Sequence, residues 1–206
     1  EQKLFMEYAK NDEMCDMCEL FLSTGLRSGE LRGLEWETDI DFKNKMIHVT
    51  GTLNYDKETG WRKDEPKTET SFRDIPMLGN VERLLKRIRR QQMETRLYMG
   101  DKWRPIEGLE NLVFLQPTGT PLHKGYMKKH LDSLQKQIRQ DGHKFKRITP
   151  HTFRHTFATR CIENGMPPQV LKTILGHSKL SMTMDLYAHV LPDTKAEEMQ
   201  KIASLF

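Results

Sequence analysis

The chain has 206 residues, 33 basic and 29 acidic side chains, and a formal net charge of +4 at pH 7. This length suits about one domain, and so small a charge does not by itself indicate a nucleic-acid-binding protein. Three cysteines, an odd number, argue against a disulfide framework and for a reducing compartment. No apolar run approaches the ~18 residues that a membrane-spanning helix needs.

The N-terminal part is predicted to form two helices with a tight corner between them. Apolar residues in "EMCDMCELFLS" recur at helical spacing, which predicts a helix over residues 12–23 that Gly25 ends. Ser28 is expected to cap a short second helix containing Glu30. Arg27 then lies in the corner, where the backbone on both sides would hold its guanidinium in one place.

The middle of the chain combines a small antiparallel sheet with long helices. "MIHVTGTLNY" and "SFRDIPM" are rich in β-branched and alternating residues and predict two strands. The polar stretch between them, residues 56–70, is interpreted as a long hairpin arm. A basic amphipathic helix is expected over residues 80–98, a short strand over 112–115 and another helix over 124–139.

The C-terminal part is predicted to be helical. Thr149 and Pro150 have the residue types of an N-cap and a first helical position. His151, Arg154 and His155 follow at i, i+3 and i+4, so they share one face of this helix. Further helices are expected in "PPQVLKTILGH", in "SMTMDLYAHV" and in residues 192–206. The predicted class is therefore mainly α with a small antiparallel β-sheet, α+β.

Two arginines, two histidines and a tyrosine have the chemistry that phosphoryl transfer requires. Arg27 and Arg154 can each donate two N–H groups to phosphate oxygens without losing their charge. His151 and His177 can move protons or donate hydrogen bonds, and the Tyr187 hydroxyl can attack phosphorus. For each side chain taken alone, an ion pair, a structural histidine or a core tyrosine is the commoner role.

The strings that contain these residues strongly resemble the catalytic boxes of the tyrosine recombinases, the phage integrase family. "GLRSGEL" resembles the first box, "HTFRHTFAT" the second and "LGHSKLSMTMDLYAHV" the third, in the family's order. "PKTETSFRDIPM" resembles the hairpin that contains the family's active-site lysine. The resemblance extends from about residue 13 to about residue 190 and is closest to integrases of conjugative transposons.

The resemblance implies the recombinase catalytic-domain fold and a role for each site residue. Tyr187 would be the nucleophile, His151 the proton-transfer histidine and His177 a donor to a non-bridging oxygen. Lys67 would be the general acid, and Lys63, four residues earlier, is its rival. Of the remaining residues, Glu30 is expected to support the arginines, and His155 and His189 are assigned either to packing or to contacts that support the catalytic residues. The expected catalytic residues are Arg27, Lys67, His151, Arg154, His177 and Tyr187.

No cofactor and no metal ion are expected. Cys15 and Cys18 form a C-x-x-C, but no second pair of ligands follows at zinc spacing, so buried helix cysteines are favoured. No acidic cluster has metal-ligand spacing, and two arginines with a lysine can supply the charge that Mg²⁺ supplies elsewhere. The sequence therefore predicts a metal-independent reaction.

Clusters of basic residues are the candidates for contact with DNA. Each cluster alone fits a solvated helix face, but three clusters flanking a phosphate site favour a surface that contacts the DNA backbone. Two of them form the predicted contact set, and Lys128 with Lys129 forms the third. The predicted contacts are Lys86, Arg87, Arg89, Arg90, Lys144, Lys146 and Arg147.

The expected function is a site-specific DNA recombinase that acts through a 3′-phosphotyrosyl intermediate to integrate and excise a mobile element. The alternatives are a type IB topoisomerase and a non-catalytic DNA-binding module. The expected partners are double-stranded DNA, three further protomers in a tetramer and an accessory excision factor, in the bacterial cytoplasm. Residues 1–206 would be the catalytic domain of a longer protein, with 192–206 as a tail helix exchanged between protomers or docked on its own domain.

Overall fold

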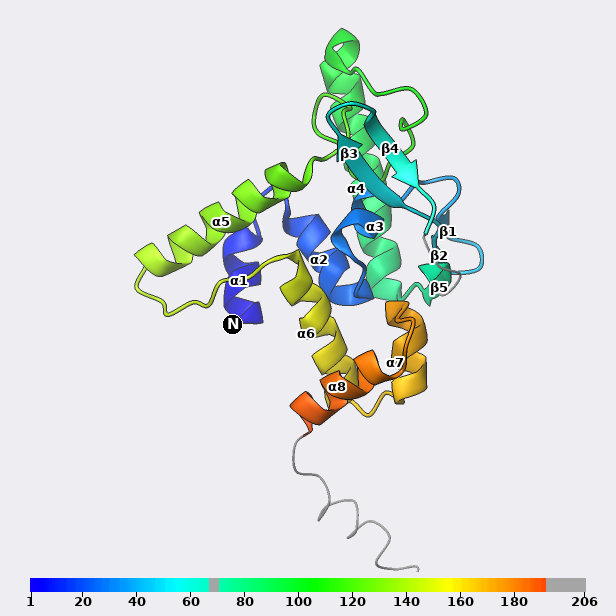
Figure 1. Ribbon diagram of the computed structural model, residues 1–206. Coiled ribbons are helices and arrows are strands. Elements are labelled where there is room, and N and C mark those ends of the chain that lie inside the picture. The colour runs from blue at the N-terminus through cyan, green and yellow to red at the C-terminus, as the bar shows by residue number, and fades with distance from the viewer. Residues whose placement is uncertain (67–70, 192–206) are drawn as a thin grey trace, which may run out of the picture.

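The structure of this chain is a computed structural model that describes residues 1–66 and 71–191 (Figure 1). The positions of its helices follow the spacing of apolar residues in the sequence. The helices are α1 (Gln2–Ala9), α2 (Cys15–Thr24), α3 (Ser28–Arg32), α4 (Gly79–Met99), α5 (Lys124–Gln140), α6 (Pro150–Glu163), α7 (Pro168–Leu175) and α8 (Ser181–Val190), with a 3₁₀ turn η2 (Gly100–Lys102). The strands are β1 (Ile40–Asp41), β2 (Met46–Val49), β3 (Thr52–Asp56), β4 (Gly60–Asp64) and β5 (Arg73–Pro76).

Most predicted helices are confirmed to within a few residues. The first of them begins later than predicted because the Asp12 carboxylate accepts the Met14 N–H at 2.8 Å and forms a turn before α2. Helix α1 was not predicted; its buried Phe5 packs edge-to-face on Phe153, with ring centroids 5.5 Å apart. This helix depends on a partner that is distant in sequence. The helix predicted within residues 192–206 lies outside the described residues.

The strands form two separate antiparallel sheets. Strands β1, β2 and β5 pair in that order, with Ile47 opposite Ile75, while β3 and β4 form a hairpin of their own. The single strand predicted over residues 46–55 is divided at Gly51, where a Cβ would lie 2.7 Å from the Lys63 side chain. The predicted strand over residues 112–115 is wrong, because Leu112 and Leu115 make only isolated bridges.

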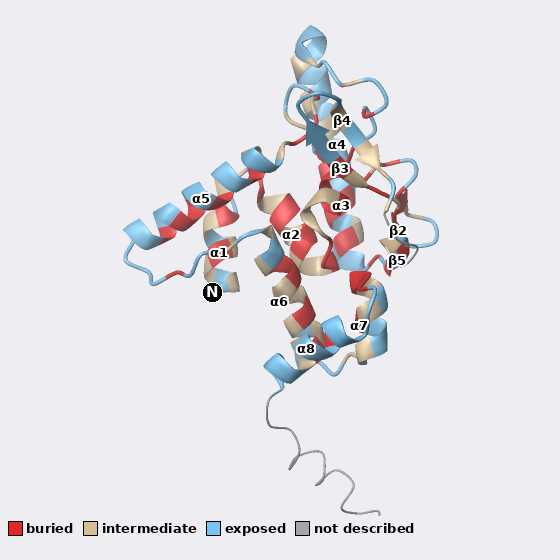
Figure 2. Ribbon diagram, viewed as in Figure 1, coloured by how far each residue is buried: buried red, intermediate tan, exposed pale blue. Residues whose placement is uncertain are grey.

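The buried residues form one large core and two smaller ones (Figure 2). The large core joins α1 to α5, the three-stranded sheet and the start of α6. A second core lies between the later turns of α6, α7 and α8, where Ala158, Ile162, Leu171 and Leu175 are buried. Helix α6 belongs to both cores, because Phe153 packs in the large one. Within the described ranges, no helix is long and apolar enough to cross a membrane.

Candidate active site

The corner between α2 and α3 fixes Arg27. Gly25 ends α2 with φ +64°, and the Phe157 ring leaves no room for a side chain there, since a Cβ would lie 2.4 Å from it. Arg27 is the N-cap of α3; its N–H donates to Glu30 Oε2 at 2.7 Å and its Nη1 to Glu30 Oε1 at 2.7 Å. Ser28, predicted as the cap, is instead the first helical residue. The Glu30 carboxylate holds both the start of the helix and the guanidinium.

Arg154 approaches the same place from α6. Its guanidinium is buried, with Nη1 donating to the Gly25 carbonyl at 2.8 Å and Nη2 to the Leu175 carbonyl at 2.6 Å. Burial, together with the nearby charge of Arg27, lowers the pKa of Arg154 to about 9. Arg154 therefore keeps its charge at neutral pH. Burying this charge costs free energy, and a bound anion would offset that cost.

A third arginine, Arg73 at the start of β5, completes the cluster and was not predicted. Its side chain is 2% exposed. Arg73 donates to both oxygens of Glu30, at 3.0 and 2.8 Å, to the Ile174 carbonyl at 2.6 Å and to the Ser71 carbonyl at 3.2 Å. The sequence contained a signal for it, because Arg73 alternates in phase with the buried Ile75 in a strand.

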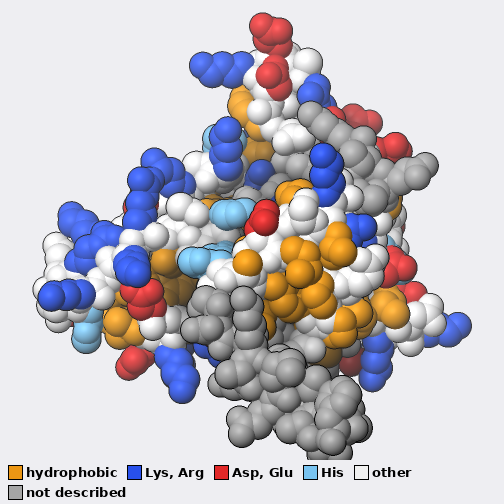
Figure 3. All heavy atoms as spheres, turned by 60° about the horizontal axis from the view of Figure 1, so that its bottom comes forward, with side chains coloured by type: hydrophobic (Ala, Val, Ile, Leu, Met, Phe, Trp, Pro, Cys, Tyr) orange, Lys and Arg blue, Asp and Glu red, His pale blue; other side chains and the backbone are white. Residues whose placement is uncertain are grey.

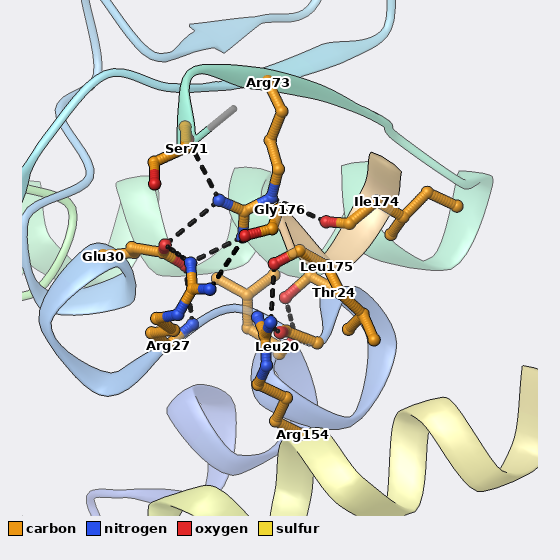
Figure 4. Close-up of polar contacts among 11 residues, drawn as sticks. Leu20, Thr24, Arg27, Glu30, Ser71, Arg73, Arg154, Ile174, Leu175 and Gly176 are labelled. Atoms are coloured by element: carbon orange, nitrogen blue, oxygen red, sulfur yellow. Dashed lines mark hydrogen bonds and ion pairs between the residues drawn. The ribbon is translucent and has the colours of Figure 1, made fainter. Parts of the chain in front are cut away.

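The three guanidiniums meet at the C-terminal end of α7 (Figure 4). Arg73, Arg154 and Arg27 donate, in that order, to the carbonyls of Ile174, Leu175 and Gly176; the last of these distances is 2.9 Å. The last carbonyls of a helix have no partner within it and form the negative end of its dipole. Gly176 ends α7 with φ +63°, and a Cβ there would lie 3.0 Å from Arg73 Nη1.

The charges of this cluster do not balance. Burial acts to raise the pKa of Glu30, but hydrogen bonds and charge from Arg73 and Arg27 outweigh it and lower that pKa to about 2. Glu30 is therefore ionised at neutral pH. One carboxylate against three guanidiniums leaves these four side chains with a net charge of +2. Because Arg27 is still 41% exposed, that charge is accessible to an anion from solvent.

The two predicted histidines lie beside the arginines. His177 follows the end of α7 and is buried, with Nδ1 2.9 Å from the Thr183 hydroxyl. Burial first, and then the charges of the three arginines, lower the pKa of His177 to about 4, so the ring is neutral at pH 7. If the Thr183 hydroxyl donates to Nδ1, Nε2 has the proton and can donate it to an oxygen. His151 is exposed in the first turn of α6.

A small hollow of about 180 Å³ brings His151, Arg154 and His177 together. His155 lines it as well, and its ring lies over the exposed His189 ring with centroids 6.2 Å apart. Tyr187 is not among the described residues that line the hollow. Its hydroxyl donates instead to the Met166 carbonyl, and its ring packs on the second core. Burial raises the pKa of Tyr187.

The two candidate lysines differ in what the structure describes. Lys63 on β4 is largely buried, and its ammonium lies 2.9 Å from Glu35 Oε2 and 2.8 Å from Asp39 Oδ2. These two carboxylates hold Lys63 as a structural ion pair, which agrees with its ranking as the rival. Lys67 lies outside the described residues, so its role stays a prediction.

The basic clusters fall on two different surfaces. On α4, Arg87 pairs with Asp16 at 2.7 Å and Lys86 with Glu82 at 2.6 Å, so acidic neighbours offset both charges. Arg89 and Arg90 are on the same helix; Arg89 lies over the Trp36 ring, 5.7 Å from its centroid. In contrast, Lys144, Lys146 and Arg147 are exposed in the segment leading to α6. Figure 3 shows basic side chains concentrated on the side where α5 lies, beside histidines.

These residues and their order match a known family. The model of the phage integrase family matches residues 2–193, almost all of the chain. The chain belongs to the phage integrase family. The corner of Arg27, the start of α6 and the α7–α8 segment are the three segments whose sequences resemble the family's boxes, and the fold brings them together.

The chain is similar to transposases and recombinases of known classes. It is 32% identical over 200 residues to the transposase from transposon Tn916 of Enterococcus faecalis, covering 95% of this chain and 46% of that protein. It is also 32% identical over 215 residues to an XerC-like tyrosine recombinase of Caldanaerobacter subterraneus, covering 100% of this chain and 53% of that protein. The chain therefore spans about half the length of these curated relatives.

Solved structures agree with this fold. The Tn1549 transposon integrase, solved in complex with transposon right end DNA, superposes with a TM-score of 0.84 at 31% identity, covering 98% of this chain and 64% of that one. The catalytic domain of the bacteriophage HP1 integrase has a TM-score of 0.53 at 19% identity and covers 100% of this chain and 94% of that one, which supports the fold alone. The predicted class, mainly α with small antiparallel sheets, is confirmed.

Proposed function

We propose that this chain is the catalytic domain of a site-specific recombinase that cuts and rejoins double-stranded DNA to integrate and excise a mobile element. The observation that supports this most directly is the convergence of Arg27 and Arg154 beside neutral His177, with an excess of positive charge. A phosphodiester has one negative charge and gains another as a fifth oxygen binds to phosphorus. The site thus stabilises the charge that develops in the transition state.

In the proposed reaction the Tyr187 oxygen attacks the scissile phosphorus. The bond from phosphorus to the 5′ oxygen breaks, and a 3′-phosphotyrosyl ester forms. His151 accepts the phenol proton, and Lys67 donates a proton to the leaving 5′ oxygen. His177 Nε2 and the two arginines donate to the non-bridging oxygens. Because a phenol of pKa about 10 is a good leaving group, the ester retains the energy needed for rejoining.

Cleavage in this scheme requires α8 to change position. The Tyr187 hydroxyl donates to the Met166 carbonyl and does not line the hollow that contains Arg154. Helix α8 packs on the second core, in which four of the described residues are fully buried. We infer that DNA binding or protomer assembly moves α8 so that the hydroxyl leaves Met166 and reaches the phosphate.

The DNA surface is proposed to extend from the active site towards α5. Lys144, Lys146 and Arg147 are exposed there, and Lys128 and Arg147 line a hollow of about 380 Å³ that reaches Ser28, next to Arg27. The α4 residues Lys86, Arg87, Arg89 and Arg90 are proposed as outer contacts, because acidic neighbours already offset part of their charge. Phosphate contacts of this kind give affinity without sequence readout.

Assembly into a DNA-bound tetramer is proposed to use the C-terminal tail. A groove of about 600 Å³ between α2, α6 and α7 is lined by apolar side chains that include Leu22, Phe157 and Val170. The apolar stripe Met199, Ile202, Ala203 and Phe206, outside the described residues, has helical spacing and fits a groove of this chemistry. A tail passed between protomers would link assembly to the nearby α8. An accessory excision factor and a cytoplasmic location in a bacterium complete the proposal.

A nicked suicide DNA substrate tests the chemistry, used with the full-length protein. The nick lets the short fragment that has the leaving 5′ oxygen at its 5′ end diffuse away, so a covalent protein–DNA adduct accumulates and can be counted on a denaturing gel. We expect a 3′-phosphotyrosyl adduct in EDTA as well as in Mg²⁺, followed by ligation to a partner duplex. No adduct would refute the recombinase, and adduct formation only with metal would refute the metal-independent scheme. An adduct that does not ligate to a partner duplex, together with relaxation of a supercoiled plasmid in a parallel assay, would favour a topoisomerase.

A further inference from the structure

Arg73 is a buried arginine that the proposed chemistry does not use. Its Nε, Nη1 and Nη2 atoms make four hydrogen bonds, all to protein oxygens. A guanidinium has five N–H groups, so Arg73 is almost saturated, and its side chain is 2% exposed. It cannot bind a DNA phosphate in the way that Arg27 can.

The partners of Arg73 belong to three separate parts of the active site. Glu30 is on α3 and holds Arg27, the Ile174 carbonyl ends the helix that precedes His177, and Ser71 directly follows the segment that contains Lys67 (Figure 4). In the sequence, Glu30 lies three positions after Arg27, Ile174 three positions before His177 and Ser71 four positions after the predicted lysine Lys67. Arg73 is therefore bonded to a residue within three or four positions of each.

We propose that Arg73 is a positioning residue that sets the geometry of the phosphate site through Glu30 and the end of α7. Glu30 accepts two bonds from Arg73 and two from Arg27, so its carboxylate plane is fixed by both arginines. Without Arg73, Glu30 is free to turn towards Arg27 alone, and the carbonyl of the half-buried Ile174 loses its guanidinium donor. A displacement of about 1 Å at a reacting group costs on the order of 10²-fold in rate.

Arg32, on the same helix α3 as Glu30, offers a matched control for Arg73. It is also buried, at 6% exposure, and also donates to two backbone carbonyls, those of Leu122 at 2.9 Å and Leu53 at 3.1 Å. These carbonyls belong to neither Glu30 nor the end of α7. Replacing Arg32 therefore removes a buried guanidinium of similar kind without touching the arginine cluster.

This inference rests on the proposed function, and the first experiment separates the two. Arg73→Lys and Arg32→Lys are compared with the unaltered protein for single-turnover adduct formation and for DNA affinity. We expect Arg73→Lys to slow adduct formation by about 10- to 100-fold with affinity changed less than threefold, and Arg32→Lys to leave the rate within about threefold. If the unaltered protein forms no adduct, the proposed function fails. If it forms one and Arg73→Lys matches it, or is slowed no more than Arg32→Lys, only the positioning role fails.

A second experiment needs no DNA and no activity. The charged groups around His177 are Arg154 and His151 on α6, Arg27 before α3 and Arg73 on β5, and all of them lower its pKa. NMR titration of His177 in folded Arg73→Met should therefore give a higher pKa than in the unaltered protein, whereas Arg32→Met should not change it. An unchanged His177 pKa in Arg73→Met would show that Arg73 does not act on this site and would overturn the proposal.

Discussion

The large core and the second core of this protein hold different halves of one active site. Arg27, Arg73 and Glu30 are anchored on elements of the large core, which joins five helices and a sheet. Tyr187 is on α8, which packs on a core with four fully buried residues. Arg27 of the proposed phosphate site is thus on the larger core, while the proposed nucleophile is on the smaller one, which we expect to open at a lower free-energy cost. The carbonyls at the end of α7 connect the two parts. The predictions below test whether the two cores differ in this way.

The largest expected effect is at the nucleophile. Tyr187→Phe removes the attacking oxygen but keeps the ring that packs on the second core. We expect complete loss of the covalent adduct on the suicide substrate, with DNA affinity within about twofold of the unaltered protein. Phe at position 187 also loses the bond to the Met166 carbonyl. A covalent adduct formed by this variant would disprove the assignment.

The next largest effect is expected on the cleavage rate when Arg154 is replaced. Arg154→Lys keeps a positive charge but cannot hold the Gly25 and Leu175 carbonyls and a phosphate at once. We expect single-turnover cleavage to fall by about 10²–10³-fold, the cost of one lost transition-state donor. Cleavage at a rate near that of the unaltered protein would mean that phosphate binding does not require a guanidinium that donates two hydrogen bonds. Arg160→Lys, an exposed arginine near the end of the same helix, serves as the control.

Replacing a buried leucine by alanine in each core should show whether the two cores differ in stability. Leu20 and Leu171 are both 0% exposed, the first in the large core and the second in the small one. Leu20→Ala should lower the free energy of unfolding of the whole domain by about 2–5 kcal/mol. Leu171→Ala should instead speed amide hydrogen exchange in α7 and α8 while α2 and α4 stay protected. Equal loss of protection everywhere would show that the two cores unfold as one.

The smallest expected effect is a pH dependence of the free energy of unfolding that comes from His177. The folded-state pKa of His177 is lowered from 6.5 to about 4, so between these values the unfolded chain binds the proton more tightly. The free energy of unfolding should therefore fall as pH drops from 6.5 towards 4, by up to about 3 kcal/mol. Chemical denaturation across this range measures it. His177→Gln should remove most of the fall, and a fall of the same size in that variant would assign it elsewhere.

The sequence predicted much of this arrangement because its signals are local. Apolar spacing is set by the period of the helix itself, so α4 and α5 were predicted to within about a residue. Gly25 was predicted to end its helix and does so with positive φ, as Gly176 does at the end of α7. Arg27, Arg154, His151 and His177 were predicted to belong to one site, and the structure gathers all four around the end of α7 or the hollow beside it, while their catalytic roles stay predictions.

What the sequence did not show depends on contacts between distant segments. Helix α1 is fixed by Phe153, almost 150 positions away, and Arg73 by Glu30 and Ile174. The direction of the Tyr187 hydroxyl is set by a backbone carbonyl, which no side-chain pattern reveals. Lys67 and the tail beyond residue 191 lie outside the described residues, so their predicted roles remain predictions.

The carbonyls at the end of α7 have a consequence for which sequence changes this fold tolerates. They are main-chain atoms, so substitutions at positions 174 and 175 leave the acceptors for Arg73 and Arg154 in place as long as the helix still packs. A single insertion or deletion within residues 168–175 is different, because each residue turns an α-helix by about 100°. Such a change would rotate all three acceptors away from their guanidiniums together. The length of this one short helix is thus a stricter requirement of the site than the identity of most side chains on it.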